Sequence, residues 1–528
     1  MTVCVIGSGP AGVACAHALL KSGASVTMLD VGFELEADRQ HRLDDVRLQA
    51  PSRERAMSMR FIREGVEVGP GGIPLKLAYG SDFPYREPGQ QPITSNGVEG
   101  KPSYARGGLS NVWGASLMPF RTADMNGWPI TVDDLAPHYR AVLELMPFSA
   151  RRDRLEAEFP LYGEQPDRLS LNRQAVELLE DLEAAHSTLA AHGISFGASR
   201  LAVAGESGEK AGCVYCSQCM YGCPYGFIYN STATLDRLRS EGGLTYMPGV
   251  VVERVIEHGS NVEVRGRTLD DGLPFSLKTD RAFLACGVFS SARVMLASLD
   301  AYDHPVRAAD NCYFLLPLLR YRKVVVAAAE ATNTLAQAFI ELNDPSISSN
   351  TIHLQVYTYN ELFRQQIRNA LGPLDRLFGN SVDRSVLSRL LLIQGYLHSD
   401  LSPGIEVTLS RASGAKPDTL SLSIAPNTGT RPALSALLRK LRSERRSIRA
   451  WPVWPALRVG EPGRGFHTGG TFPMRSDPRE FETDELGRPY GLSRVHVVDA
   501  SVFPSLPATT ITLSVMANAH RIGSAAAG

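Results

Sequence analysis

The sequence has no long hydrophobic run and no excess of charge of either sign. No apolar stretch approaches the roughly 20 residues that a bilayer-spanning helix needs, so we expect no transmembrane segment. Lysine and arginine number 54 against 55 aspartates and glutamates, and a net charge of −1 gives no electrostatic basis for binding nucleic acid. The first predicted strand starts at Thr2, so we also expect no cleaved targeting segment.

Cysteine is scarce outside one short segment. Four of the eight cysteines lie at positions 213–223, so the chain is not a disulfide scaffold. This distribution favours a reducing, cytoplasmic location and a local role for the cluster. Internal repeats and low-complexity tracts are also missing. Because 528 residues exceed the roughly 250–300 that one hydrophobic core supports, we expect at least two subdomains.

A glycine-rich turn lies near the start of the chain, between a short apolar strand and an alanine-rich helix. Gly7 allows the tight bend, Gly9 lets the backbone approach a diphosphate, and Gly12 lets the helix pack on the strand. The helix N-terminus offers free N–H groups to a diphosphate. A second strand ends at Asp30, which can accept a ribose hydroxyl. The pattern predicts a site for FAD or NAD.

Later motifs decide between these two cofactors. A second glycine-rich loop contains Gly108 and Asn111 and offers backbone donors and an amide. Further motifs are Trp128-Pro129 with Leu135 and Tyr139, Ala285-Cys286-Gly287 with Ser291 and Arg293, and the stretches 467–474 and 497–504. In this order they resemble the glucose–methanol–choline (GMC) family of FAD-dependent oxidoreductases, and in particular its sugar and alcohol dehydrogenases that carry a cysteine motif. The resemblance hardly touches residues 310–460.

The resemblance implies a set of cofactor contacts. Val252 would lie against the adenine of FAD, and Asn111 near the flavin ring. Asp499 and Ala500 would lie beside the ribityl and diphosphate groups. For Val252 a plain core position is equally compatible with the sequence.

His467 is the predicted catalytic base. A flavin takes hydride from an alcohol carbon most easily when a base near neutral pKa removes the hydroxyl proton at the same time, and histidine suits this role. His467, Gly470 and Thr471 match the family's H-x-x-G-T motif. The family's second catalytic residue is usually His or Asn followed by Pro. Here Thr510 and Ile511 occupy those positions, and threonine cannot serve as a neutral-pH base.

Alternating polar residues in the second half of the chain suggest a substrate pocket. His353, Gln355 and Tyr357 alternate with apolar residues, as do Gln394, Tyr396 and His398. In strands, such positions share one face. The two faces either line a cavity or form the solvated side of a sheet.

The cysteine cluster admits three interpretations. Its members Cys213, Cys216, Cys219 and Cys223 have the spacing of a ferredoxin motif. An iron–sulfur cluster that passes flavin electrons onward is one interpretation, and reduced thiols or a local disulfide are another. A Cys4 zinc site is the third, although its gaps are tight for such a site.

The expected architecture is an α/β Rossmann-like FAD-binding domain joined to an α+β substrate domain on an antiparallel sheet. Residues 1–305 would form the FAD-binding domain with helical and cysteine-rich excursions, 306–460 the substrate domain, and 461–528 a return to the first domain. A basic helix with arginines between 439 and 449 closes the substrate domain. Its charged face is either solvated or docks on a membrane surface or a partner.

The leading hypothesis is an FAD-dependent oxidation of an alcohol, on a sugar, polyol or other substrate, to a carbonyl. Hydride would go to flavin N5 and the proton to His467. Electrons would leave to oxygen, a quinone, a cytochrome or another redox partner. Because of Thr510, a flavoprotein of lyase or isomerase type is the alternative, and a non-catalytic binding protein is a third.

Overall fold

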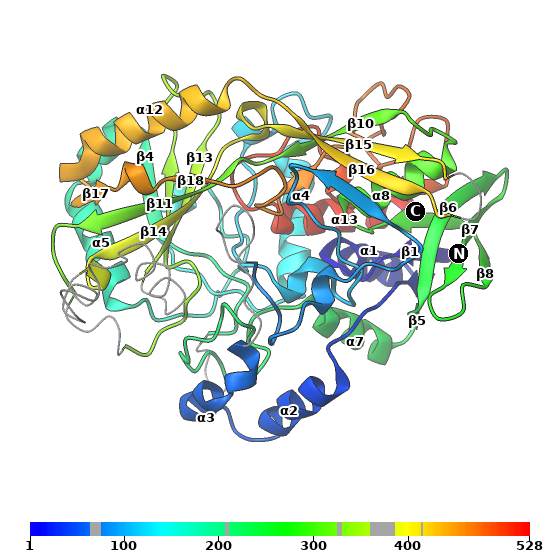
Figure 1. Ribbon diagram of the computed structural model, residues 1–528, viewed down its shortest axis with the longest axis horizontal. Helices are drawn as coiled ribbons and strands as arrows, with labels where there is room; N and C mark the ends of the chain where they lie inside the picture. Colours follow the sequence, from blue (N-terminus) through cyan, green and yellow to red (C-terminus); the bar gives the residue numbers. More distant parts are fainter. Residues whose placement is uncertain (64–74, 206–210, 325–329, 359–385, 413–415, 528) are drawn as a thin grey trace.

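The computed structural model describes residues 1–63, 75–205, 211–324, 330–358, 386–412 and 416–527. A parallel sheet and both chain termini lie at one end of the molecule, and a large antiparallel sheet lies at the other (Figure 1). The two ends of the sequence therefore meet in one part of the structure.

The N-terminal strand lies at the centre of a five-stranded parallel sheet with the order β20-β9-β1-β2-β5. Its strands are β1 (Thr2–Ile6), β2 (Ser25–Leu29), β5 (Leu244–Met247), β9 (Arg281–Leu284) and β20 (Val495–Val497). Val3 to Ile6 of β1 are all buried, because other elements pack on both faces of this sheet. The predicted Rossmann-like, discontinuous domain is confirmed.

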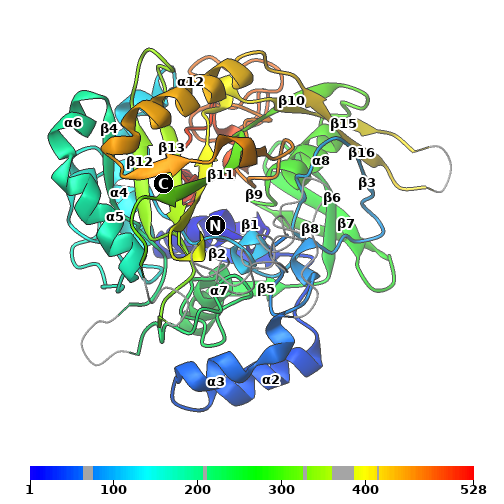
Figure 2. The ribbon, with the colours of Figure 1, turned by 60° about the vertical axis from the view of Figure 1, so that its left-hand side comes forward.

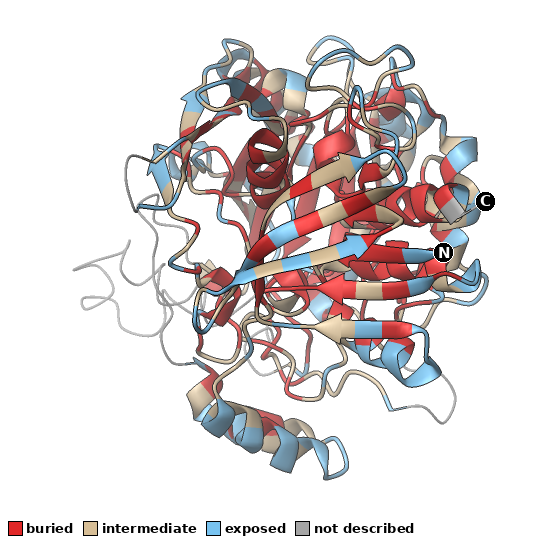
Figure 3. Ribbon diagram, turned by 90° about the vertical axis from the view of Figure 1, so that its right-hand side faces the viewer, coloured by how far each residue is buried: buried red, intermediate tan, exposed pale blue. Residues whose placement is uncertain are grey.

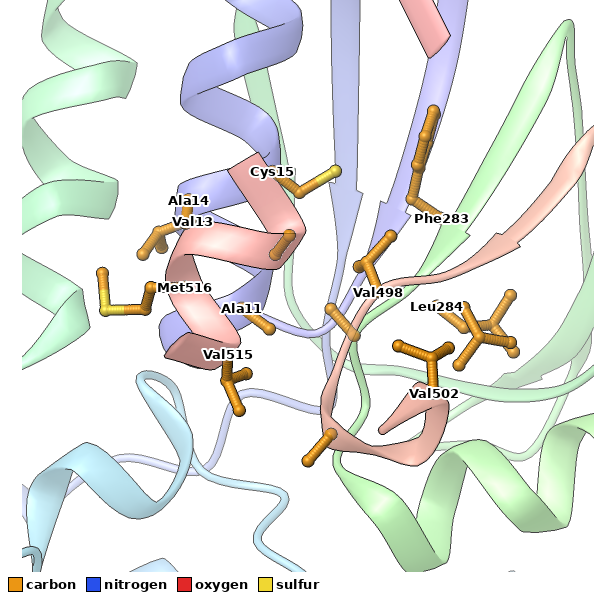
Figure 4. Packing of buried hydrophobic residues seen from close by; sticks show 14 of the residues in the cluster. Ala11, Val13, Ala14, Cys15, Phe283, Leu284, Val498, Val502, Val515 and Met516 are labelled. Atoms are coloured by element: carbon orange, nitrogen blue, oxygen red, sulfur yellow. The ribbon is translucent and has the colours of Figure 1, made fainter. Parts of the chain in front are cut away.

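Two helices from opposite ends of the chain pack together on this sheet. They are α1 (Pro10–Lys21) and α13 (Thr512–Ala527). Figure 4 shows Val515 and Met516 of α13 beside Ala11 and Ala14 of α1. Small residues allow this close approach, since a side-chain carbon on Gly523 would lie 2.9 Å from the Cys15 carbonyl oxygen.

A smaller antiparallel sheet adjoins the parallel sheet. It consists of β6 (Val250–His258), β7 (Asn261–Thr268) and β8 (Pro274–Thr279) in that order. Helix α8 (Val288–Ser298) packs against β6. Val252 lies on the buried face of β6, near the end of the parallel sheet.

The large antiparallel sheet has the order β17-β11-β14-β13-β12-β4, and β18 pairs with β11 beside β17. Its strands are β4 (Ile194–Ala198), β11 (Tyr313–Arg320), β12 (Ala338–Leu342), β13 (Ile352–Tyr357), β14 (Leu390–Tyr396), β17 (Ala450–Pro452) and β18 (Arg458–Val459). Gln355 of β13 lies directly opposite Gln394 of β14. The two predicted polar faces are therefore adjacent.

Two strands that follow residue 400, β15 and β16, belong to a different sheet. In the order β19-β10-β15-β16-β3, this sheet contains β3 (Ile93–Asn96), β10 (Pro305–Asp310), β15 (Gly404–Ser410), β16 (Thr419–Ala425) and β19 (Thr468–Gly469). The predicted antiparallel sheet is present, and residues 306–460 also contribute strands to this further sheet. Strand β10 ends at Asp310 and β11 begins at Tyr313, so the chain passes directly from one sheet to the other. The predicted domain boundaries stay a prediction.

Further helices lie outside the sheets. They are α2 (Ala37–Arg47), α3 (Arg53–Ser58), α4 (Val132–Leu143), α5 (Arg173–Ala184), α6 (His186–Ala191), α7 (Ser231–Glu241) and α12 (Thr430–Ser443). The predicted basic helix is α12, which buries Leu434, Leu437 and Leu441 against the large sheet (Figure 2). Thr131 and Asp134 form the predicted capping box of α4.

Helices α2 and α3 project from the body of the molecule and are largely exposed, whereas the sheets are mostly buried (Figure 3). Among the helices that the structure describes, each is too short or too polar to cross a bilayer.

Candidate active site

Two cavities lie next to each other between the parallel sheet and the large antiparallel sheet. The first has a volume of about 230 Å³ and the second of about 250 Å³. Pro10, Leu109, Phe466 and Thr512 line both of them. A long ligand such as a dinucleotide could therefore extend from the first cavity into the second.

The glycine fingerprint forms the floor of the first cavity. Gly7 and Gly9 line it, and Gly7 has a φ of +102°, which favours glycine. Gly12 lies behind them, where a side-chain carbon would come within 1.9 Å of the Gly7 carbonyl oxygen. The three glycines thus occupy the positions that the fingerprint predicts.

Asp30 lies at the end of β2 and lines the same cavity. It accepts a hydrogen bond from Ser8 Oγ, which in turn accepts one from the Gly107 amide at 2.9 Å. Burial raises the pKa of Asp30 to about 6, although hydrogen bonds from Ser8 and Tyr246 oppose this. The carboxylate is therefore held in place at the cavity edge, as a ribose hydroxyl acceptor requires.

The second glycine-rich loop contributes backbone rather than its predicted amide. Gly108 lines the first cavity and lies within 3.3 Å of Gly9, measured from the carbon that a side chain would add. Asn111 lines neither cavity. Its amide donates to the Arg106 and Gly108 carbonyls at 3.0 and 2.7 Å and accepts from Asn230 at 2.6 Å. Asn111 therefore braces the loop from behind.

The remaining predicted cofactor residues line the first cavity. Val252 lies on its wall, and Asp499 and Ala500 lie where β20 ends. Asp499 accepts hydrogen bonds from the backbone amides of Gly287 and Ser501, both at 2.9 Å. Burial raises the pKa of Asp499, and the bonds from Ser291 and Ser501 oppose the rise. These bonds tie the β9–α8 turn to the C-terminal stretch.

His467 and Thr510 both line the second cavity. The His467 ring stacks on Tyr396 with 4.7 Å between ring centroids, and burial lowers its pKa to about 3. Within the described part of the chain, His467 Nδ1 and Thr510 Oγ1 are buried without a hydrogen-bond partner. The cavity thus holds a neutral imidazole and an unused hydroxyl.

The two predicted polar strand faces form one wall of this cavity. Gln355, Tyr357, Gln394 and Tyr396 all line it, so the pocket interpretation is favoured over a solvated sheet face. His398 lies elsewhere, because β14 ends at Tyr396 and the chain turns. Its Nδ1 accepts from the Asp400 amide at 3.1 Å and caps the next turn.

Sequence reasoning missed Lys76, which also lines the second cavity. Its Nζ donates to the Trp113 carbonyl at 2.7 Å, and burial lowers its pKa to about 8. Tyr313 of β11 was missed as well. A single lysine outside any motif gives no signal in the sequence. Tyr313 belongs to a strand that contains Pro317, and proline within a run argues against a strand.

The four clustered cysteines line a separate cavity of about 20 Å³ with apolar neighbours such as Phe227 and Leu335. All four are free thiols, and burial raises the pKa of Cys216 to about 12. Among the described residues, we find no group of three or more His, Cys, Asp or Glu side chains that could hold a metal ion. The described residues therefore give no support to an iron–sulfur cluster or a zinc ion at this segment.

A family model for GMC oxidoreductases matches residues 457–519, the segment that carries His467, Asp499 and Thr510. In this segment the chain resembles GMC oxidoreductases. The resemblance supports an FAD-dependent oxidoreductase. No curated protein matches the chain significantly in sequence.

Solved structures of the same fold cover nearly the whole chain. Pyridoxine 4-oxidase from Mesorbium loti is 15% identical with a TM-score of 0.58, and the match covers 99% of this chain and 98% of that one. A variant of formate oxidase from Aspergillus oryzae RIB40 is 14% identical with a TM-score of 0.60, covering 99% and 97%. At this identity the likeness describes the fold.

Proposed function

We propose that this GMC oxidoreductase oxidises the CH–OH group of a small alcohol to a carbonyl, with FAD as the hydride acceptor and His467 as the proton acceptor. The observation that carries the proposal is the position of His467. It lines a cavity that adjoins the nucleotide cavity and shares Pro10, Leu109, Phe466 and Thr512 with it.

The residues of the first cavity fit the adenosine and diphosphate parts of FAD. Gly7, Gly9 and the N-terminus of α1 would hold the diphosphate, and Asp30 a ribose hydroxyl. Val252 would contact the adenine, and Asp499 would lie near the chain that leads to the ring. When bound, FAD supplies the hydride acceptor that no side chain can provide. The α13 N-terminus at Thr512 lies where the two cavities meet and would favour negative charge there.

His467 is neutral in the resting protein because burial disfavours its cation. It is therefore able to accept the hydroxyl proton. A protonated imidazole in this cavity is stabilised only when negative charge lies beside it. Proton acceptance by His467 is thus coupled to the departure of the hydride from the substrate carbon.

Thr510 would position the substrate oxygen. Its hydroxyl is buried in the same cavity, and it can donate or accept a hydrogen bond without changing charge. In this proposal His467 acts as the single base, and Thr510 takes the place that a second base occupies in other family members. Nothing in the described residues favours a lyase or isomerase reaction.

The electron acceptor and the compartment belong to the same proposal. We propose molecular oxygen as the acceptor, since both structural relatives are named as oxidases. Hydrogen peroxide released during turnover would support this acceptor, and turnover only with a quinone or cytochrome would contradict it. The free cysteines fit a reducing cytoplasm. We route no electron step through the cysteine segment, and iron and sulfide analysis of the purified protein tests this.

An anaerobic titration with alcohols tests the reaction. The flavin absorbance near about 450 nm should bleach with a substrate alcohol. A His467→Ala variant with FAD bound should bleach at least about 100-fold more slowly, because a general base contributes 10²–10⁴-fold.

His398→Asn is the matched control, since His398 is a buried histidine of the same region outside the cavity and asparagine can replace its capping bond. It should bleach at the rate of the unaltered protein. Equal rates in His467→Ala and the unaltered protein would remove His467 from the mechanism.

A further inference from the structure

A buried carboxylate and a buried histidine lie directly behind the wall of the substrate cavity. Glu341 of β12 is opposite His353 of β13 in the sheet register, and Glu341 Oε1 lies 2.6 Å from His353 Nδ1. Both side chains are fully buried, and neither lines the cavity. Burying such a pair costs free energy compared with apolar residues of the same size. The pair therefore calls for a role beyond packing.

Hydrogen-bond chemistry fixes the tautomer of His353. Gln355 Nε2 lies 3.2 Å from His353 Nε2, and an amide nitrogen can only donate. His353 Nε2 must then accept, which places the proton of the neutral ring on Nδ1. That proton points at Glu341, which accepts it. Glu341 thus determines which group donates and which accepts in each hydrogen bond that follows from His353.

The chain of bonds continues to two hydroxyl groups of the cavity wall. With its nitrogen directed at His353, Gln355 has its carbonyl oxygen on the other side. This oxygen accepts from Tyr357 Oη at 3.2 Å and from Ser116 Oγ at a longer 3.5 Å. Both hydroxyls line the substrate cavity. Because their protons point into the wall, their lone pairs face the cavity.

We propose that Glu341 and His353 are positioning residues that act through Gln355 to make this wall a hydrogen-bond acceptor, so that the enzyme selects alcohols with a second O–H or N–H donor near the reacting carbon. This inference rests on the proposed alcohol oxidation. It assigns a substrate requirement to residues that touch neither the substrate nor the cofactor.

The wall and the catalytic histidine form one stack of rings. Tyr396 lies between His353 and His467, with centroid distances of 6.2 Å and 4.7 Å and a tilt of 24° on each side. A donor group held at Tyr357 would therefore be bound on the same side of the cavity as His467. This arrangement links substrate selection to the position of the base.

If the donor and acceptor roles in these hydrogen bonds were reversed, the cavity wall would select different substrates. If His353 carried protons on both nitrogens, Gln355 would have to turn its carbonyl oxygen toward the ring. Tyr357 and Ser116 would then accept from the Gln355 nitrogen and donate into the cavity. Such a wall would select substrates with a carbonyl, carboxylate or ether oxygen at this position.

Nitrogen NMR on the FAD-bound protein with ¹⁵N-labelled histidine shows which nitrogen of His353 carries the proton, and it needs no substrate. We expect His353 as a neutral ring with its proton on Nδ1. In Glu341→Gln the group opposite Nδ1 can donate as well as accept, so the His353 signals should shift toward the other tautomer or broaden between the two. Ser195→Ala is the control, because Ser195 faces Glu341 from β4 and its buried hydroxyl has no partner among the described residues. A doubly protonated His353, or identical signals in Glu341→Gln, overturns the proposal.

A pair of probe alcohols tests the substrate requirement. Vicinal diols that bleach the flavin are compared with their mono-methyl ethers, which retain the reacting CH–OH but lack the second donor. The unaltered enzyme should favour the diol in kcat/KM, and Tyr357→Phe should reduce this preference about tenfold through the diol alone. An undiminished preference in Tyr357→Phe overturns the inference. If no alcohol bleaches the flavin, the proposed oxidation fails. The NMR result still decides whether the hydroxyls of the cavity wall accept or donate hydrogen bonds.

Discussion

At the scale of single residues, Thr510 shows how this chain departs from the GMC motif that it otherwise resembles. Its hydroxyl lies in the cavity with His467 and is buried without a partner among the described residues. A buried hydroxyl without a partner costs free energy in the resting protein. A substrate oxygen that enters the cavity would remove this cost.

Two substitutions at Thr510 separate its hydroxyl from its shape. Thr510→Val keeps the shape and removes the hydroxyl, so kcat/KM for flavin reduction should fall about tenfold, the effect of one hydrogen bond. Thr510→Ser keeps the hydroxyl and should stay within about threefold of the unaltered enzyme. Anaerobic stopped-flow absorbance measures both rates. A Thr510→Val enzyme as fast as Thr510→Ser would contradict a positioning role.

The residues that the sequence revealed are those with motif chemistry. Gly7, His467 and Asp499 could be found because their backbone or acid–base roles demand particular residue types at particular spacings. Lys76 could not, since a solitary lysine carries no pattern. Asn111 shows the converse, because an amide in a motif can serve the loop rather than the ligand. His398 failed for a geometric reason, as alternation is informative only while the strand continues.

At the scale of elements, two glycines at the β1–α1 junction have different tasks, Gly9 just before α1 and Gly12 in its first turn. Gly12 lies where a side-chain carbon would collide with the Gly7 carbonyl, whereas at Gly9 no atom lies within 4 Å of such a carbon and φ is −65°. Gly9 nevertheless lines the nucleotide cavity. One glycine thus serves the packing of helix on strand, and the other serves the ligand.

Alanine at these two positions should give different defects. Gly12→Ala should lower the unfolding temperature with or without added FAD, because overpacking costs about 1–3 kcal/mol. Gly9→Ala should keep the unfolding temperature of the FAD-free protein and weaken FAD binding at least about tenfold, because the methyl group occupies ligand space. Thermal unfolding and FAD fluorescence titration measure the two quantities. Equal destabilisation by both changes would contradict the division of tasks.

The elements that could be predicted are those whose partners lie close in sequence. The β1–α1–β2 unit follows from local pattern, and so does the basic helix α12. Sheet membership after residue 400 did not follow, because β16 pairs with β3, which lies some 300 residues earlier and carries no matching signal. Strand β11 was hidden by Pro317, a residue that is usually kept out of sheet interiors.

At the scale of the whole molecule, three histidines join helices from distant parts of the chain. His17 of α1, His138 of α4 and His520 of α13 lie together, with 2.9 Å between the Nδ1 atoms of His138 and His520. Burial, helped by the nearby charge of Lys21, lowers the pKa of His17 to about 4 and of His520 to about 3. The junction is therefore built from neutral rings.

Acid should loosen this junction. In the unfolded chain these histidines titrate near 6.5, above their pKa in the folded state, so the unfolded chain binds more protons as the pH falls below 6.5. The stability they contribute is complete above pH 6.5 and is lost as the pH falls toward 4. The unfolding temperature should drop over this range and drop less in His520→Gln. His41→Gln, an exposed histidine, is the control. The same acid slope in His520→Gln and the unaltered protein would contradict this.

The return of the chain end to its beginning also governs when this enzyme can form during synthesis. Strand β20 completes the edge of the parallel sheet, and α13 packs on α1 and lines both cavities. The first strands and α1 leave the ribosome long before their partners are translated. The cofactor cavity can therefore be completed only once β20 and α13 have been synthesised. A chain truncated before Val495 would lack the part of the cavity lined by Thr512 and Val515.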